Sequence, residues 1–229
     1  MIERLLFPRR CPICDEVISS KEYICKKCED IPRIVPMPRC VKCSKHVARS
    51  GILCPDCERE KKSFVKGIAL YEYDSVKESI HALKDSAKFD NATFFADMIY
   101  KHLGDILKSF NAEAIVPIPL HKDKFKKRGF NQSLLIANEL SKHLNIPVRD
   151  DILIRVEKTK DQKTMTHSER QNNLVGAFHM PQNDVKLDTV LVLDDVYTTG
   201  ATMEEATRTL MRGGVNKVYF IAAAIGIGE

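Results

Sequence analysis

The first 57 residues of the 229-residue chain contain all eight of its cysteines, arranged as four C-x-x-C turns. Ten residues separate the first turn from the second, and ten separate the third from the fourth. Two such turns complete the tetrahedral four-sulfur shell that zinc prefers. The expected zinc ligands are Cys11, Cys14, Cys25, Cys28, Cys40, Cys43, Cys54 and Cys57. The spacing predicts a small module that folds around zinc, since so short a segment has little core of its own.

Sequential pairing of the turns is the favoured arrangement and gives two structural zinc sites. Crossed pairing, or one surviving site, is the alternative. A closed shell of four thiolates has no open position for catalysis. A redox dithiol would need one C-x-x-C opening a helix beside a strand, and a disulfide framework would need an exported chain. The N-terminus lacks the apolar segment of a signal peptide, and no apolar run approaches the length of a membrane span. We therefore expect a cytoplasmic protein without membrane insertion.

Net charge does not by itself indicate a nucleic-acid partner. Residues 1–63 hold 14 Lys and Arg against 9 Asp and Glu, a surplus of 5, and the remaining residues hold 22 of each. Two four-thiolate zinc sites would add about four negative charges to the first segment and so nearly cancel that surplus. The hydrophobic fraction of 44% is enough for a packed core.

From residue 64 onward, segments typical of strands alternate with segments typical of helices. Strands are expected at 64–73, 112–120, 188–195 and 216–226, and helices at 75–85, 92–109, 131–144 and 202–214. This alternation predicts an α/β fold with a parallel sheet and helices on both faces. Ser75 is expected to cap its helix, with Glu78 completing a capping box. The change of pattern divides the chain into a zinc module at 1–63 and an α/β domain at 64–229.

The stretch "VLVLDDVYTTGAT", residues 190–202, indicates a ligand site. Its apolar run predicts a strand buried on both faces. Asp194 and Asp195 then lie at the carboxyl edge of the sheet, where α/β proteins bind ligands. The following Thr/Gly turn opens a helix whose free N–H groups and dipole favour a phosphate. Two carboxylates beside a phosphate suit the hydroxyls of a phosphorylated ribose; an ordinary buried strand with a polar turn is the alternative.

This stretch resembles the phosphoribosyl pyrophosphate (PRPP) signature of type I phosphoribosyltransferases. The cysteine module, "VPIPLHKDKFKKRGFNQSLLIANEL" and "TKDQKTMTHSERQNNLVGAF" make nearly the whole chain similar to the ComF family. The resemblance implies that Asp194 and Asp195, the expected catalytic residues, hold the ribose hydroxyls. It implies that Mg²⁺ bridges pyrophosphate and ribose. It also implies that PRPP lies against Val196, Tyr197, Thr198, Thr199, Gly200, Ala201 and Thr202.

Further PRPP-binding residues follow from the same resemblance. The segment 117–121 matches a pyrophosphate loop, "RGFNQ" is a shared motif, and 157–172 matches a loop that closes over PRPP. These segments contribute Pro119, Leu120, His121, Arg128, Gln132, Gln162 and Arg170. A plain proline turn and a solvated linker are the alternatives for the two loops. The basic run at 122–128 is either a solvated face or a contact for pyrophosphate or nucleic acid.

The resemblance links the chain to natural competence, the uptake of transforming DNA. We therefore expect a PRPP-binding protein that transfers a phosphoribosyl group, with Mg²⁺, to an acceptor that the sequence does not identify. The alternative function is a non-catalytic factor that binds single-stranded DNA on the same scaffold. Other competence proteins, such as a DNA translocase, are the protein partners that the resemblance suggests.

Overall fold

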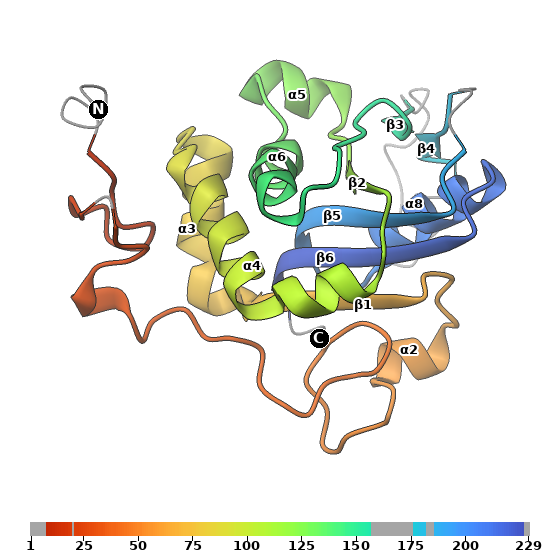
Figure 1. The fold of residues 1–229 in the computed structure, drawn as a ribbon, viewed down its shortest axis with the longest axis horizontal. Coiled ribbons are helices and arrows are strands. Elements are labelled where there is room, and N and C mark those ends of the chain that lie inside the picture. The colour runs from red at the N-terminus through yellow and green to blue at the C-terminus, as the bar shows by residue number, and fades with distance from the viewer. Residues whose placement is uncertain (1–7, 20, 157–175, 182–185, 227–229) are drawn as a thin grey trace, which may run out of the picture.

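A parallel four-stranded sheet forms the centre of the protein (Figure 1). The structure is a computed structural model that describes residues 8–19, 21–156, 176–181 and 186–226. The strand order is β1-β6-β5-β2, and every neighbouring pair is parallel. The strands are β1 (Lys66–Glu72), β2 (Ala114–Pro117), β5 (Thr189–Tyr197) and β6 (Lys217–Ile225). The expected α/β class is confirmed.

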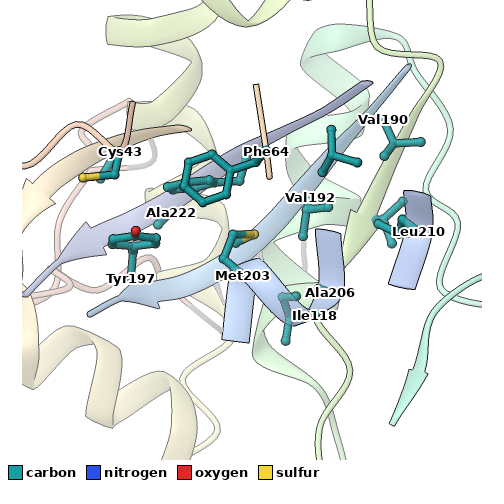
Figure 2. Packing of buried hydrophobic residues seen from close by; sticks show 14 of the residues in the cluster. Cys43, Phe64, Ile118, Val190, Val192, Tyr197, Met203, Ala206, Leu210 and Ala222 are labelled. Atoms are coloured by element: carbon teal, nitrogen blue, oxygen red, sulfur yellow. The ribbon is translucent and has the colours of Figure 1, made fainter. Parts of the chain in front are cut away.

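Helices cover both faces of this sheet. One face packs against α3 (Tyr73–Asp85), α4 (Asp90–Ser109) and α6 (Gln132–Leu144), whose apolar side chains form a single cluster with Leu191 and Leu193 of β5. The opposite face packs against α8 (Ala201–Arg212) through Met203, Ala206 and Leu210 (Figure 2). Because β5 is buried on both faces, its residues 190–193 are apolar without alternation.

Several shorter helices and strands lie outside the central sheet and its covering helices. The N-terminal module contains a 3₁₀ turn η1 (Lys26–Cys28) and α2 (Pro55–Arg59). The basic run forms α5 (Lys122–Arg128), which ends at Gly129 in the left-handed conformation (φ 80°). Strands β3 (Ile154–Arg155) and β4 (Phe178–His179) pair antiparallel. Within the described ranges, no helix combines the length and the apolar character that crossing a bilayer requires.

The prediction that Ser75 caps a helix is wrong. Helix α3 begins at Tyr73, directly after β1, and its N-cap position is Glu72, which makes no side-chain cap bond. The Ser75 hydroxyl instead donates to the Glu72 carbonyl at 2.7 Å and accepts from the Arg33 N–H at 2.9 Å. The Ser75 hydroxyl therefore joins the N-terminal module to the end of β1 and forms no capping box.

Strand β5 also runs further than the sequence predicts. It continues to Tyr197, because β6 pairs with it as far as Ile225. The acid pair therefore lies inside the last part of the strand and not after its end.

Candidate functional site around the acid pair and the second cysteine cluster

The two adjacent carboxylates of β5 are held by the start of α6. The Gln132 side-chain amide donates to Asp195 Oδ1 at 3.0 Å, and the Ser133 hydroxyl donates to Asp194 Oδ1 at 3.0 Å. Lys84, in the last turn of α3, forms an ion pair with Asp195 Oδ2. Asp195 is buried, at 4% exposure. The positive end of the α6 dipole and the Lys84 ammonium thus stabilise negative charge where the sheet meets these helices.

The Asp194 carboxyl has a raised pKa. Burial and the neighbouring charge of Asp195 raise the pKa of Asp194 to about 8, although the Ser133 hydrogen bond opposes this. In the free protein Asp194 therefore holds a proton near neutral pH. A ligand that brings hydroxyl donors or a cation to the pair favours loss of that proton.

Arg128 reaches the acid pair only through Gln132. Its guanidinium donates to Gln132 Oε1 at 2.6 Å and lies 3.8 Å from Asp85 Oδ1. It therefore positions the amide that binds Asp195. A pocket of about 410 Å³ opens here between α3 and α5, and four cations line it: Lys84, Lys124, Lys127 and Arg128.

The loop after β2 lies beside β5. The Ile118 N–H donates to the Leu193 carbonyl at 2.9 Å, and the Asn131 side chain donates to the Ile118 carbonyl at 3.0 Å. Pro119, Leu120 and His121 follow and are half-buried. The His121 ring accepts from the Asp123 N–H at 3.3 Å and so caps α5. The predicted ligands Gln162 and Arg170 lie outside the described residues.

The turn between β5 and α8 exposes backbone and small side chains. Thr198 and Thr199 are exposed, and Ala201 and Thr202 are half-buried at the first turn of α8. The turn lines a small hollow that also reaches Asp194 and Val196. Gly200 has φ +81°, and a Cβ there would lie 2.2 Å from the Tyr197 hydroxyl oxygen. Only glycine fits this position, because a side chain would clash with the Tyr197 ring and the backbone is left-handed.

The side chain of Tyr197 packs in the core beneath this turn, with its hydroxyl oxygen against Gly200. It is 3% exposed and stacks on Phe220 with ring centroids 4.7 Å apart. Its hydroxyl points toward Cys43 (Figure 2). Burial, with the negative charge of the nearby cysteines, raises the pKa of Tyr197. The Tyr197 ring is therefore covered by the turn and buried.

The cysteines gather into two separate clusters, which confirms sequential pairing of the turns. In each cluster all four sulfurs lie within 4.8 Å of one another. The Sγ atoms of Cys14 and Cys25 are 3.5 Å apart, as are those of Cys43 and Cys54. A zinc tetrahedron with bonds of about 2.3 Å has edges of about 3.8 Å. The two groups are Cys11, Cys14, Cys25 and Cys28, and Cys40, Cys43, Cys54 and Cys57.

The sulfur chemistry of the second cluster fits a bound cation. Hydrogen bonding from Cys43 and Cys57 lowers the pKa of Cys40, whereas the contact with Cys40 raises the pKa of Cys43. Without a cation, the ionised thiolate of one cysteine makes ionisation of the neighbouring thiols less favourable. A divalent metal would allow all four to ionise, so the donor set fits structural zinc. Zinc would cross-link the module, and its four thiolate ligands would leave no open coordination position for catalysis.

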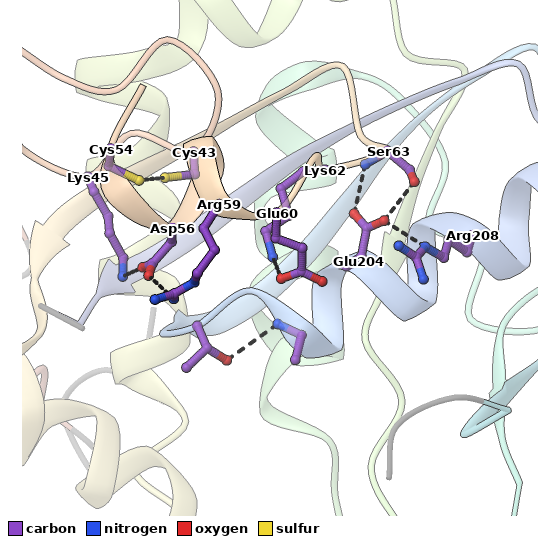
Figure 3. Close-up of polar contacts among 12 residues, drawn as sticks. Cys43, Lys45, Cys54, Asp56, Arg59, Glu60, Lys62, Ser63, Glu204 and Arg208 are labelled. Carbon is purple, nitrogen blue, oxygen red and sulfur yellow. Dashed lines mark hydrogen bonds and ion pairs between the residues drawn. The ribbon is translucent and has the colours of Figure 1, made fainter. Parts of the chain in front are cut away.

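The second cluster packs directly against the sheet domain. Its four cysteines share a hydrophobic cluster with Tyr197, Phe64 and Phe220. Figure 3 shows the polar contacts at this junction. The N–H and hydroxyl of Ser63 donate to Glu204 at 2.8 and 2.6 Å, and Arg208 donates to the same carboxylate at 2.7 Å. The junction thus holds both Tyr197 and the first turn of α8.

Lys84, Ser133 and Glu204 are the residues at this site that the sequence reasoning did not select. Lys84 lies 111 residues before its partner Asp195, and Glu204 lies 141 residues after Ser63. Such pairings leave no local pattern in the sequence. Ser133 directly follows the "RGFNQ" motif, so extending that motif by one residue would have found it.

Two family models match the chain. Residues 2–58 match the double zinc ribbon domain, and residues 131–225 match the phosphoribosyl transferase domain. Competence protein F of Haemophilus influenzae is 28% identical over 222 residues, covering 93% of this chain and 95% of that protein. ComFC of Bacillus subtilis is 28% identical over 209 residues, covering 86% and 82%.

A third relative is the DNA utilization protein YhgH of Escherichia coli. It is 25% identical over 219 residues, covering 93% of this chain and 96% of that protein. These matches run through both the cysteine module and the sheet domain. We therefore identify the chain as a homologue of competence protein F and ComFC that joins a double zinc ribbon domain to a phosphoribosyl transferase domain.

Proposed function

We propose that this protein binds PRPP with Mg²⁺ as a phosphoribosyltransferase of the cytoplasm that acts in the uptake or use of DNA. One observation carries the proposal. The acid pair of β5 and a small hollow at the start of α8 are adjacent and share Asp194. A ribose 5-phosphate carries hydroxyls and a phosphate on one sugar, and these are the groups that a carboxylate pair and a helix N-terminus favour.

Each part of PRPP then has a partner. The ribose hydroxyls donate to Asp194 and Asp195, and the 5′-phosphate lies against the main chain and hydroxyls of 198–202. The pyrophosphate lies toward the loop 117–121. Mg²⁺, when bound with PRPP, neutralises charge on the leaving pyrophosphate. The chain's own residues orient the ribose and hold negative charge near its ring, where positive charge develops as the C1–O bond breaks.

The role in DNA metabolism rests on the relatives. Their names refer to competence and to DNA utilization. The pocket with four cations between α3 and α5 favours a second candidate function, which is binding of single-stranded DNA through its phosphates. In that case affinity should fall steeply with salt concentration, whether or not PRPP is present.

The deciding experiment is a calorimetric titration of PRPP with Mg²⁺ into the wild type and into Asp194→Asn/Asp195→Asn. We expect one PRPP per chain in the wild type and at least about tenfold weaker binding in the variant, a loss of about 1.4 kcal/mol. Asp105→Asn, an exposed change in α4, serves as the control and should bind like the wild type. Equal PRPP affinity in all three proteins would show that the ribose does not bind at the acid pair. No binding to the wild type would leave DNA binding as the leading function.

A further inference from the structure

One member of the first cysteine cluster is open to solvent. This cluster consists of Cys11, Cys14, Cys25 and Cys28. Cys14 is exposed, whereas the seven other cysteines of the chain are buried. A thiolate is oxidised more readily where solvent reaches it. Cys14 is therefore the zinc ligand that an oxidant dissolved in water meets first.

The sulfur of Cys14 also has a second sulfur close by. Its Sγ lies 3.5 Å from Sγ of Cys25, which belongs to the other C-x-x-C turn of the cluster. The sulfurs of a disulfide are about 2.05 Å apart, so these two would have to approach by roughly 1.5 Å. Cys43 and Cys54 of the second cluster have the same spacing, but both are buried. Access to solvent, and not spacing, therefore distinguishes the two clusters.

The two clusters also differ in the core that surrounds them. Apart from its cysteines, the first cluster contains buried Ile18 and the partly buried Ile13 and Ile24. The second cluster belongs to a much larger core that includes Phe64 and Phe220. A segment with so little apolar surface depends on its metal to stay folded. Loss of zinc from the first cluster should therefore unfold the first half of the ribbon and leave the second half folded.

Polar contacts dock the first half of the ribbon on α3, α4 and the turn between them. They begin at residues close to the first C-x-x-C turn: the Pro12 carbonyl accepts from the Ser79 hydroxyl at 2.6 Å, Arg9 pairs with Asp97 at 3.3 Å, and Asp15 pairs with Lys88 at 2.8 Å. Each of these contacts needs residues 9–15 in their folded arrangement. Unfolding around the first cluster should therefore release this half of the ribbon from the helices.

We propose that Cys14 and Cys25 form a site of reversible oxidation by peroxides, at which a disulfide replaces the zinc ion. The Cys14 thiolate attacks one oxygen of hydrogen peroxide, the O–O bond breaks, and hydroxide leaves as a sulfenic acid forms. The Cys25 thiolate then attacks the Cys14 sulfur and expels a second hydroxide. Two thiolates thus give two electrons to the peroxide. Zinc leaves because two of its four ligands are lost, and a dithiol reverses the change by thiol–disulfide exchange.

The test treats the full-length, zinc-loaded protein with hydrogen peroxide and counts its zinc by native mass spectrometry. We expect a form with two zinc ions to become a form with one, and peptide mapping to find a disulfide between Cys14 and Cys25. Dithiothreitol with added zinc should restore the first form. Trypsin should cut the oxidised protein faster within residues 8–33, with no change within residues 34–63. Neither readout requires PRPP, so the result is independent of the proposed function.

A pair of ligand exchanges tests the role of Cys14. Cys14→His keeps a zinc ligand but removes the sulfur that the peroxide attacks. It should hold both zinc ions at a peroxide dose that removes one from the wild type. Cys28→His, the same exchange within the same cluster, keeps the reactive pair and should lose one zinc like the wild type.

Three results would overturn the oxidation site. The first is a wild type that keeps both zinc ions under peroxide or loses zinc from the second cluster first. The second is a disulfide map of the oxidised wild type that lacks the bond between Cys14 and Cys25, and this map decides the question even where a variant fails to fold. The third is zinc release from Cys14→His as fast as from the wild type.

Discussion

Asp194 and Asp195 place two carboxylates side by side in a buried strand, and different donors hold each of them. Asp195 has both an amide donor and a cation, whereas Asp194 has the Ser133 hydroxyl and a main-chain N–H. Burial and the neighbouring charge of Asp195 raise the pKa of Asp194 to about 8, so Asp194 holds a proton near neutral pH. Ionisation of Asp194 beside Asp195 reduces stability in the free protein, and the carboxylates provide acceptors for a ligand.

Replacing Asp194 by Asn should stabilise the free protein above neutral pH. Its folded pKa of about 8 is raised from 3.8, so the folded chain binds the proton more tightly than the unfolded chain. The wild type is therefore most stable below the unfolded pKa and loses this contribution as pH rises through the folded pKa. The amide remains neutral. Since Asp194 is partly exposed, we expect a gain of about 2 kcal/mol at pH 9 and little at pH 4.

Urea unfolding between pH 4 and pH 9 measures this difference. Asp105→Asn, in the exposed part of α4, is the control and should follow the wild type at every pH. Parallel stability curves for the wild type and Asp194→Asn would show that Asp194 is ionised throughout.

Helix α6 is the element that organises the acid pair. Asn131 caps it by accepting from the Ser133 N–H at 3.0 Å, and its amide also donates to the Ile118 carbonyl. One side chain thus sets the start of α6 and ties it to the loop after β2. The next two residues are the donors to the carboxylates.

Asn131→Ala should destabilise the fold by about 1–2 kcal/mol, the usual cost of losing an N-cap. It should also weaken PRPP binding, because Gln132 and Ser133 lose their fixed position. Asn131→Asp separates the two roles, since it keeps the capping oxygen but cannot donate to Ile118. We expect it to recover most of the stability and only part of the affinity. Chemical denaturation measures the stability of both variants, and titration measures their PRPP affinity. Equal PRPP affinity in the wild type and both variants would show that α6 does not contribute to the site.

At the scale of the whole molecule, the two cysteine clusters differ in what they support. The first contacts α3 and α4, where the Ser79 hydroxyl donates to the Pro12 carbonyl at 2.6 Å and Arg9 pairs with Asp97 at 3.3 Å. The second shares the core with Tyr197 and so borders the phosphate turn. Zinc in the second cluster should therefore stabilise the ligand site as well as the ribbon.

Cys43→Ser and Cys14→Ser should each lose one zinc per chain. Cys43→Ser should weaken PRPP binding by about tenfold or more, about 1.4 kcal/mol, because the Tyr197 ring loses its packing partner. Cys14→Ser should leave that affinity nearly unchanged. Native mass spectrometry counts the metal, and calorimetry measures PRPP. Equal weakening by both substitutions would contradict a specific link between the second cluster and the turn.

The cysteine clusters, the parallel sheet and the candidate phosphate turn could be predicted from the sequence, because each depends on a local pattern of residues. The spacing of the C-x-x-C turns predicted two four-sulfur clusters, since metal geometry needs only short loops. The apolar run before Asp194 predicted a strand buried on both faces, and the alternation of segments predicted the parallel sheet. The Thr/Gly turn after this strand identified the candidate phosphate site.

Tertiary structure alone decided which distant groups meet. Lys84 reaches Asp195, Ser75 binds the N-terminal module instead of capping α3, and Tyr197 turns into the core beside Cys43. A pocket at the ends of β1 and β6 is likewise lined by residues of both the ribbon and the sheet domain, among them Val35 and Ile225. Local sequence patterns report the period and the capping of each element. They do not report how the chain packs one element on another, and that packing sets the charge, burial and partners of the site.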